Sequence, residues 1–280
     1  MNRILTQLSK ALSLSISINL LVSLLSLRSN SISIKKITRA ASSVPTFTSC
    51  TVPNSFALTF DDGPGSLCNE LDEALNQLNI QATFFLNGKN FGCIYDHAEC
   101  LKRRYLRGDL LGNHGWDHNH MNQLNAQEMH LQLSKVEDAM IKILGVKPLY
   151  FRPPYGEYND LLLQVLGERG YKGLILWTND SGDSMAVPPS PQEIIELYKT
   201  FKVQSNILNH ETKDFTIKQV VPSIVPALKS KGYHFIPVAS CLGESDPSLW
   251  YSYVSAPSAR DVSFFCRGFP SKKVILFTKI

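Results

Sequence analysis

Three histidines and an aspartate stand close together in the sequence NHGWDHNHM, residues 113–121. His114 and His118 are four positions apart, so a helical or tightly turned backbone could bring both imidazoles to one metal ion. His120 lies two positions further on and is expected to point elsewhere. Imidazoles also serve as surface groups or hydrogen-bonded core residues. By itself the segment therefore offers two candidate metal ligands and leaves a purely structural role open.

A pair of carboxylates follows an apolar run in TFDDGPG, residues 59–65. Successive side chains point to opposite faces of a strand, so Asp61 and Asp62 can take separate roles. One of them could bind a metal while the other acts as a base. The alternative is an aspartate that only stabilises the sharp Gly-Pro-Gly turn that follows.

The elements that would position these residues alternate along the chain. Short apolar runs predict strands at residues 56–60, 82–86, 109–112, 148–151, 173–177, 206–210 and 233–238. Amphipathic stretches predict helices at 68–78, 96–107, from 125 onward, 159–169, 190–202 and 215–230, two of them with capping boxes, Asn125 with Glu128 and Ser190 with Glu193. Repeated strand and helix units predict a single α/β domain built on a parallel sheet or barrel.

Each candidate side chain lies at or just after the C-terminal end of a predicted strand. Active sites of parallel α/β folds lie at that end of the sheet. We therefore expect one site that contains Asp61, Asp62, His114, Arg152, Asp180, Asp183 and His210.

Composition and charge restrict the class of protein. Of the 280 residues, 44% are hydrophobic and 19% charged, which is typical of a folded globular protein. The formal charge of +4 comes without a dense stripe of lysine and arginine, so no nucleic-acid partner is expected.

The N-terminal region predicts export. Arg3 and Lys10 precede an uncharged apolar stretch at 11–27, so residues 1–28 are predicted to be a cleaved signal peptide. An uncleaved anchor is the alternative, and only in that case would the protein associate with a membrane. Residues 29–49 predict a Ser-rich linker. The six cysteines of an exported chain predict disulfide bonds, whose pairing the residues alone leave open.

Five segments of the chain resemble the motifs of the NodB-type polysaccharide deacetylases, carbohydrate esterase family 4. In chain order they are ALTFDDGP, HGWDH, RPPYG, DSGD and ILNH. The resemblance covers residues 50–250, leaves 251–280 as a divergent C-terminal tail, and is greatest to fungal chitin deacetylases. It implies a distorted (β/α) barrel in one domain, and a secreted, monomeric hydrolase in the medium or cell wall. The implied substrate is chitin or a chitooligosaccharide, whose N-acetylglucosamine units lose their acetyl groups. The alternatives are a peptidoglycan or chitooligosaccharide deacetylase, more distantly one for acetylated xylan, or a non-catalytic cell-wall glycan-binding protein.

The resemblance also implies a metal centre. Asp62, His114 and His118 match ligands of a divalent metal, expected to be Zn²⁺, with Co²⁺ or Mn²⁺ as alternatives. The donor set supports this independently, because two histidines and one carboxylate leave positions open for water and substrate. Asp61 then matches the catalytic base, and the backbone N–H of Tyr155 matches the group that stabilises the developing oxyanion.

Four further residues match supporting roles in the family. Arg152 matches the residue that holds the base, and a guanidinium favours the ionised form of a neighbouring carboxylate. The alternative for Arg152 is a surface ion pair worth less than about 1 kcal/mol. His210 matches the general acid, Asp183 the residue that orients it and raises its pKa, and Leu208 a residue of the acetyl-methyl pocket.

The chain departs from the family pattern at Gly115, where a serine or threonine is usual, and at Ser184, where a tryptophan is usual. Neither change removes an implied ligand, base or acid. The family further implies a Cys50–Cys241 disulfide. A local Cys93–Cys100 bridge is also expected, with Cys68 and Cys266 unassigned.

Overall fold

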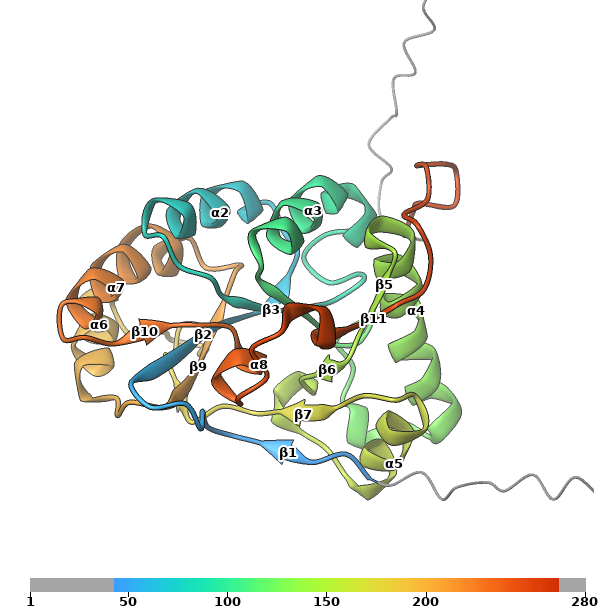
Figure 1. Cartoon of the computed structure of the whole chain (residues 1–280), viewed down its shortest axis with the longest axis horizontal. Helices are drawn as coiled ribbons and strands as arrows, with labels where there is room; N and C mark the ends of the chain where they lie inside the picture. Colours follow the sequence, from blue (N-terminus) through green and yellow to red (C-terminus); the bar gives the residue numbers. More distant parts are fainter. Residues whose placement is uncertain (1–42, 267–280) are drawn as a thin grey trace, which may run out of the picture. The chain divides into compact units, whose positions relative to one another are not determined.

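The computed structural model describes residues 43–266 (Figure 1). The predicted signal peptide, most of the predicted linker and residues 267–280 lie outside the described residues. Among the residues that are described, no helix is long and apolar enough to cross a membrane.

A parallel sheet forms the centre of the domain. Its strands run in the order β1, β7, β6, β4, β3, β2, β9, β8, and β10 pairs with β2 as well. The bounds are β1 Thr46–Phe47, β2 Ser55–Gly63, β3 Thr83–Leu86, β4 Leu110–Asn113, β6 Tyr150–Phe151, β7 Gly173–Ile175, β8 Asn179–Asp180, β9 Ser205–His210 and β10 His234–Phe235. Between the two ends of this path, the Thr178 hydroxyl donates to the Thr48 carbonyl across 2.7 Å. The predicted distorted α/β barrel is thereby confirmed.

Helices surround the strands (Figure 1). Their bounds are α2 Cys68–Gln77, α3 Ala98–Arg107, α4 Ala126–Leu144, α5 Asp160–Glu168, α6 Pro191–Thr200, α7 Val221–Lys229 and α8 Val238–Cys241. Shorter helical segments are η1 Ile94–His97, η2 Met121–Gln123, η3 Pro154–Gly156, η4 Thr216–Val220 and η5 Pro247–Trp250. Both predicted capping boxes are present, at the start of α4 and of α6.

The helix predicted at 215–230 consists of two parts, the π-helical turn η4 and the α-helix α7. Pro222, near the start of α7, has no N–H to donate to the carbonyl four residues earlier, so one α-helical hydrogen bond is missing where η4 meets α7. The wider η4 turn precedes this proline and carries Thr216, a residue that contacts the site described below.

Two strands lie just outside the range predicted for the domain. β1 falls in the predicted linker and pairs with β7, and β11 (Tyr251–Tyr253) falls in the predicted tail and pairs antiparallel with β5 (Val146–Pro148). Both are too short for an alternating pattern to reveal them in the sequence.

Three disulfides occur in the described part of the chain: Cys50–Cys241, Cys68–Cys100 and Cys93–Cys266. The first was implied by the family resemblance and is confirmed. The expected Cys93–Cys100 bridge is wrong, because Cys100 lies on α3 facing Cys68 of α2, whereas Cys93 faces the segment that follows β11. Cys266 thus connects the predicted tail to the rest of the domain.

Candidate active site

Asp61 and Asp62 end the central strand β2, and both carboxylates reach the same site. The pairing with β3 shifts register between Phe60 and Gly63, and Asp62 has a φ of 72°. This departure from extended backbone breaks the alternation that would place neighbouring side chains on opposite faces. Nε2 of His114 therefore lies 3.8 Å from Oδ2 of Asp61 and 3.6 Å from Oδ1 of Asp62.

His114 and His118 approach Asp62 from the loop that follows β4. Nε2 of His118 lies 3.1 Å from Oδ1 of Asp62, and the donor atoms of these three residues lie within 4.8 Å of one another. Nδ1 of His114 contacts the carbonyl oxygen of Arg152 at 2.7 Å, which directs Nε2 toward the carboxylates. His118 has a φ of 56°, so the two imidazoles converge through a tight turn and not through a helix.

The site fits a divalent metal on its own geometry. Oδ1 of Asp62 is buried, and within the described part of the chain it has no well-directed hydrogen bond, although Nε2 of His118 lies 3.1 Å away. A buried carboxylate oxygen that is not fully hydrogen-bonded is costly, and a cation between it and the two imidazoles would satisfy it. Burial alone would raise the pKa of Asp62, but the contact with His118 and the neighbouring His114 lower it to about 2. Burial also lowers the pKa of His114, which favours the neutral imidazole that binds metals.

Side chains distant in the sequence hold the histidine loop in place. Asn87, directly after β3, donates to the carbonyl oxygens of His114 and Gly115 at 2.8 and 2.9 Å. Gln132 on α4 accepts the backbone N–H groups of Trp116 and Asp117 at 2.8 and 2.9 Å. Sequence reasoning missed both residues, because a lone amide on a helix or after a strand carries no local signal.

Gly115 has a φ of 78°, a conformation that glycine adopts without strain. A Cβ at this position would have no neighbour closer than 3.8 Å, so there is room for a side chain. Glycine is therefore favoured by the backbone conformation and not by lack of space. Trp116 is 9% exposed and packs near Tyr95.

Arg152 is completely buried beside Asp61. Nη1 donates to Oδ1 of Asp61 at 2.9 Å and to the Thr59 hydroxyl at 2.6 Å. Its remaining nitrogens donate to the carbonyls of Ile175 and Leu176 and to Oδ1 of Asn206. The alternative of a weak surface ion pair is therefore wrong, and the guanidinium fixes one oxygen of Asp61 in a single position.

His210 ends β9 and contacts Asp183 through two hydrogen bonds. Its Nδ1 lies 2.7 Å from Oδ1 of Asp183, and its backbone N–H donates to Oδ2 at 2.9 Å. Thr216 of η4 donates to the same Oδ2 at 2.8 Å. Burial alone would lower the pKa of His210, but Asp183, together with Asp61 and Asp62, outweighs burial and raises it.

A groove opens over these residues. It is lined by Asp61, Asp62, Phe91, His114, His118, Pro153, Tyr155, Trp177, Asp180, Ser184, Leu208, His210 and Lys213. Every residue expected in the site lines this groove except Arg152 and Asp183, which are completely buried and contact the lining residues Asp61 and His210. Phe91, Trp177 and Lys213 were not expected from the sequence. Ser184, where the family usually has tryptophan, places its hydroxyl 3.3 Å from Nε2 of His210.

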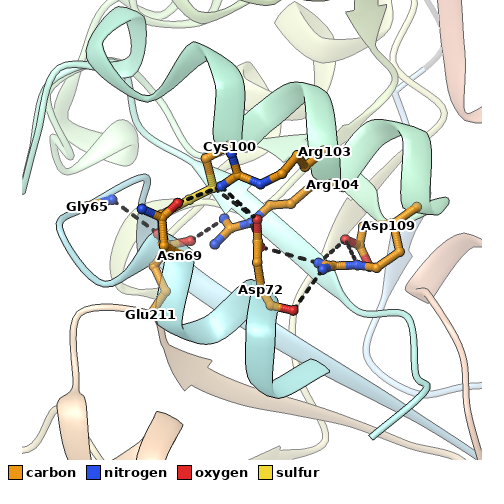
Figure 2. The surroundings of a disulfide bond; sticks show 10 residues. Gly65, Asn69, Asp72, Cys100, Arg103, Arg104, Asp109 and Glu211 are labelled. Atoms are coloured by element: carbon orange, nitrogen blue, oxygen red, sulfur yellow. Dashed lines mark hydrogen bonds and ion pairs between the residues drawn. A yellow bond between two sulfur atoms is a disulfide. The ribbon is translucent and has the colours of Figure 1, made fainter. Parts of the chain in front are cut away.

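A network of buried ion pairs joins α2, α3 and the residue that follows His210 (Figure 2). Arg104 of α3 donates to Oδ1 of Asp72 at 2.8 Å and to Oε2 of Glu211 at 2.6 Å. Glu211 directly follows His210, and its other oxygen accepts the backbone N–H of Gly65 at 3.1 Å. One carboxylate therefore connects α3 to the loop after Asp62 and to the end of β9.

The same contact explains the glycine of the DDG sequence. A Cβ on Gly63 would lie 2.0 Å from Cδ of Glu211, so a larger residue would displace this carboxylate. The Cys68–Cys100 disulfide joins α2 to α3 one turn away from the Asp72–Arg104 pair, and both therefore hold the same two helices together.

Comparison with known proteins agrees with this geometry. A family model described as polysaccharide deacetylase matches residues 48–174. A chitin deacetylase from Pestalotiopsis sp. is 36% identical over 220 residues, which cover 75% of this chain and 72% of that protein. The chain belongs to the polysaccharide deacetylase family.

Solved structures and further relatives of this polysaccharide deacetylase extend the match. The structure of the chitin deacetylase from the fungal pathogen Colletotrichum lindemuthianum has a TM-score of 0.71 at 29% identity, over 76% of this chain and 97% of that one. A peptidoglycan-N-acetylglucosamine deacetylase from Bacillus cereus is 32% identical over 188 residues, 66% of each chain. The family membership that the five motifs predicted is confirmed, and with it the assignment of the chain as a hydrolase.

Proposed function

We propose that this polysaccharide deacetylase removes acetyl groups from N-acetylglucosamine units of chitin or chitooligosaccharides. The observation that carries the proposal is the convergence in one groove of Asp61, a candidate metal site and His210. The relatives from Pestalotiopsis and Colletotrichum are chitin deacetylases, which favours chitin. The Bacillus cereus relative makes peptidoglycan the second candidate substrate.

Asp62, His114 and His118 would hold the divalent metal. Two imidazoles and one carboxylate suit Zn²⁺, and Co²⁺ or Mn²⁺ would accept the same donors with other affinities. When bound, such a metal lowers the pKa of a water and polarises a carbonyl oxygen. The protein's own residues supply the remaining parts of the reaction.

Asp61 would act as the base that takes a proton from the attacking water. Arg152 occupies one oxygen of Asp61, which leaves the other, Oδ2, to accept the proton. His210, held by Asp183, would protonate the amine as the carbon–nitrogen bond breaks, so that acetate and a free amine leave. The raised pKa of His210 keeps a larger protonated fraction near neutral pH.

Two groove residues would contact the acetyl group itself. The backbone N–H of Tyr155 would donate to the developing oxyanion. Leu208 is 5% exposed and lines the groove, where it would contact the acetyl methyl group.

We further propose that the enzyme is secreted and monomeric. Three disulfides in the described residues suit an oxidising compartment. Residues 1–28 would then be the signal peptide, and the linker that follows would end before β1, which belongs to the sheet of the deacetylase domain.

The test is to load the protein with zinc and measure acetate released from chitopentaose and, in parallel, from peptidoglycan fragments. We expect acetate from chitopentaose, and a higher rate on peptidoglycan would instead support the second substrate. Binding of chitopentaose without any acetate would support the non-catalytic alternative and contradict the proposal.

A further inference from the structure

The third histidine of the sequence NHGWDHNHM contacts the loop that carries Tyr155. The His120 imidazole stacks on the Tyr155 ring, with centroids 4.0 Å apart and planes 11° from parallel. Its Nδ1 lies 2.8 Å from Oε2 of Glu157, two residues after Tyr155. His120 therefore holds this loop at two points.

Tyr155 needs such support because its backbone is strained. Its φ of 60° and ψ of 4° are uncommon for a residue with a bulky side chain. The residue is also 55% exposed, so little of the core surrounds it. Besides the stack with His120, the Tyr155 ring makes an edge-to-face contact with the His118 imidazole, with ring centroids 4.6 Å apart, so it contacts both histidines.

His120 is not placed to bind the metal. It does not belong to the group of Asp62, His114 and His118, the candidate metal ligands at this site among the described residues. Its Nδ1 is occupied by Glu157 and its face by Tyr155. It connects the loop of the candidate metal ligands to the loop that would receive the acetyl oxygen.

We propose that His120 is a positioning residue, which holds Tyr155 so that its backbone N–H points at the acetyl oxygen in the transition state. The inference rests on the proposed deacetylase function. An aromatic stack at this distance stabilises one loop conformation, and its loss lowers the fraction of molecules in which the N–H is in place. Because that contact would form in the transition state, kcat should fall while KM changes little.

The experiment compares His120→Ala with His120→Phe, which retains a ring but cannot bind Glu157. We expect His120→Ala to lower kcat on chitopentaose about tenfold, in line with a stacking contribution of this kind. His120→Phe should stay within about threefold of the wild type, because a partly solvent-exposed pair such as that with Glu157 contributes little. Both variants should bind as much zinc as the wild type.

His130→Ala is the matched control, because His130 on α4 also pairs with a glutamate, Glu168, at 3.3 Å and is also half-buried. The stack can also be tested without substrate or metal, by the NMR chemical shift of the Tyr155 ring in protein that is isotope-labelled at tyrosine. His120→Ala should shift it, since the stacked imidazole no longer lies over the ring, and His130→Ala should not.

Three results would overturn the inference: an unchanged kcat in His120→Ala, an equal loss in the alanine and phenylalanine variants, or a raised KM with normal kcat, which would mean that His120 contacts the sugar. Each of these three results can be obtained only if the wild-type protein is active. A wild-type protein that binds zinc but releases no acetate would instead contradict the proposed function, while the Tyr155 resonance would still report on the stack.

Discussion

Replacing Glu211 with glutamine is expected to destabilise the fold strongly, because the carboxylate and its partner Arg104 have no exposure to solvent. Removing one partner of a buried ion pair typically costs about 3–5 kcal/mol, since the other charge stays buried. Glutamine can still accept the N–H of Gly65, and Arg104 keeps Asp72 at 2.8 Å. The unfolding free energy should therefore fall by about 3 kcal/mol, the lower end of that range.

Urea denaturation with the disulfides intact measures this loss as a difference in unfolding free energy. The matched control is Glu196→Gln, which removes the same charge from an exposed pair with Lys199 on α6 and should leave the midpoint unchanged. The double variant Arg104→Met with Glu211→Gln should cost less than the sum of its single changes, because the two side chains are in contact. Equal midpoints for Glu211→Gln and Glu196→Gln would refute the reasoning.

Two other predictions concern the site itself. Asp183→Asn removes the negative charge that raises the pKa of His210, so the general acid should lose its proton at lower pH and activity should fall first on the alkaline side. A pH profile of kcat identical to that of the wild type would contradict this role. Gly115→Ser restores the residue type usual in the family, yet it should lower the unfolding free energy by about 1–2 kcal/mol, because residue 115 has a left-handed backbone. Urea denaturation tests this, and an equal or higher stability would show that the loop can relax.

The fold was largely predictable because its strands are continuous apolar runs and its helices carry their own signals. Residues 55–61 of β2 are buried on both faces, which gives an apolar segment that ends at the two aspartates. Asn125 and Ser190 mark the starts of α4 and α6 by local hydrogen bonds that depend only on neighbouring residues.

Contacts between distant segments were less predictable. Cys93 and Cys100 are near in sequence, but Cys93 precedes η1 whereas Cys100 lies in α3, and each is buried against a different, distant cysteine. The positive φ of Asp62, which brings both aspartates into one site, depends on the register with β3.

Similarly, the burial of Arg152 depends on hydrogen-bond acceptors from three other strands or loops. The stack of His120 on Tyr155 could not be inferred from the spacing of the histidines, because Tyr155 belongs to a loop after another strand.

The most direct test of the central claim is to measure bound zinc and released acetate for Asp61→Asn side by side with the wild type. Asparagine keeps the shape of the side chain and leaves Asp62, His114 and His118 in place, but it cannot take a proton from water. We predict one zinc ion per chain, as in the wild type, and no detectable acetate from chitopentaose. Acetate release at the wild-type rate by the zinc-loaded variant would contradict the assignment of Asp61 as the base.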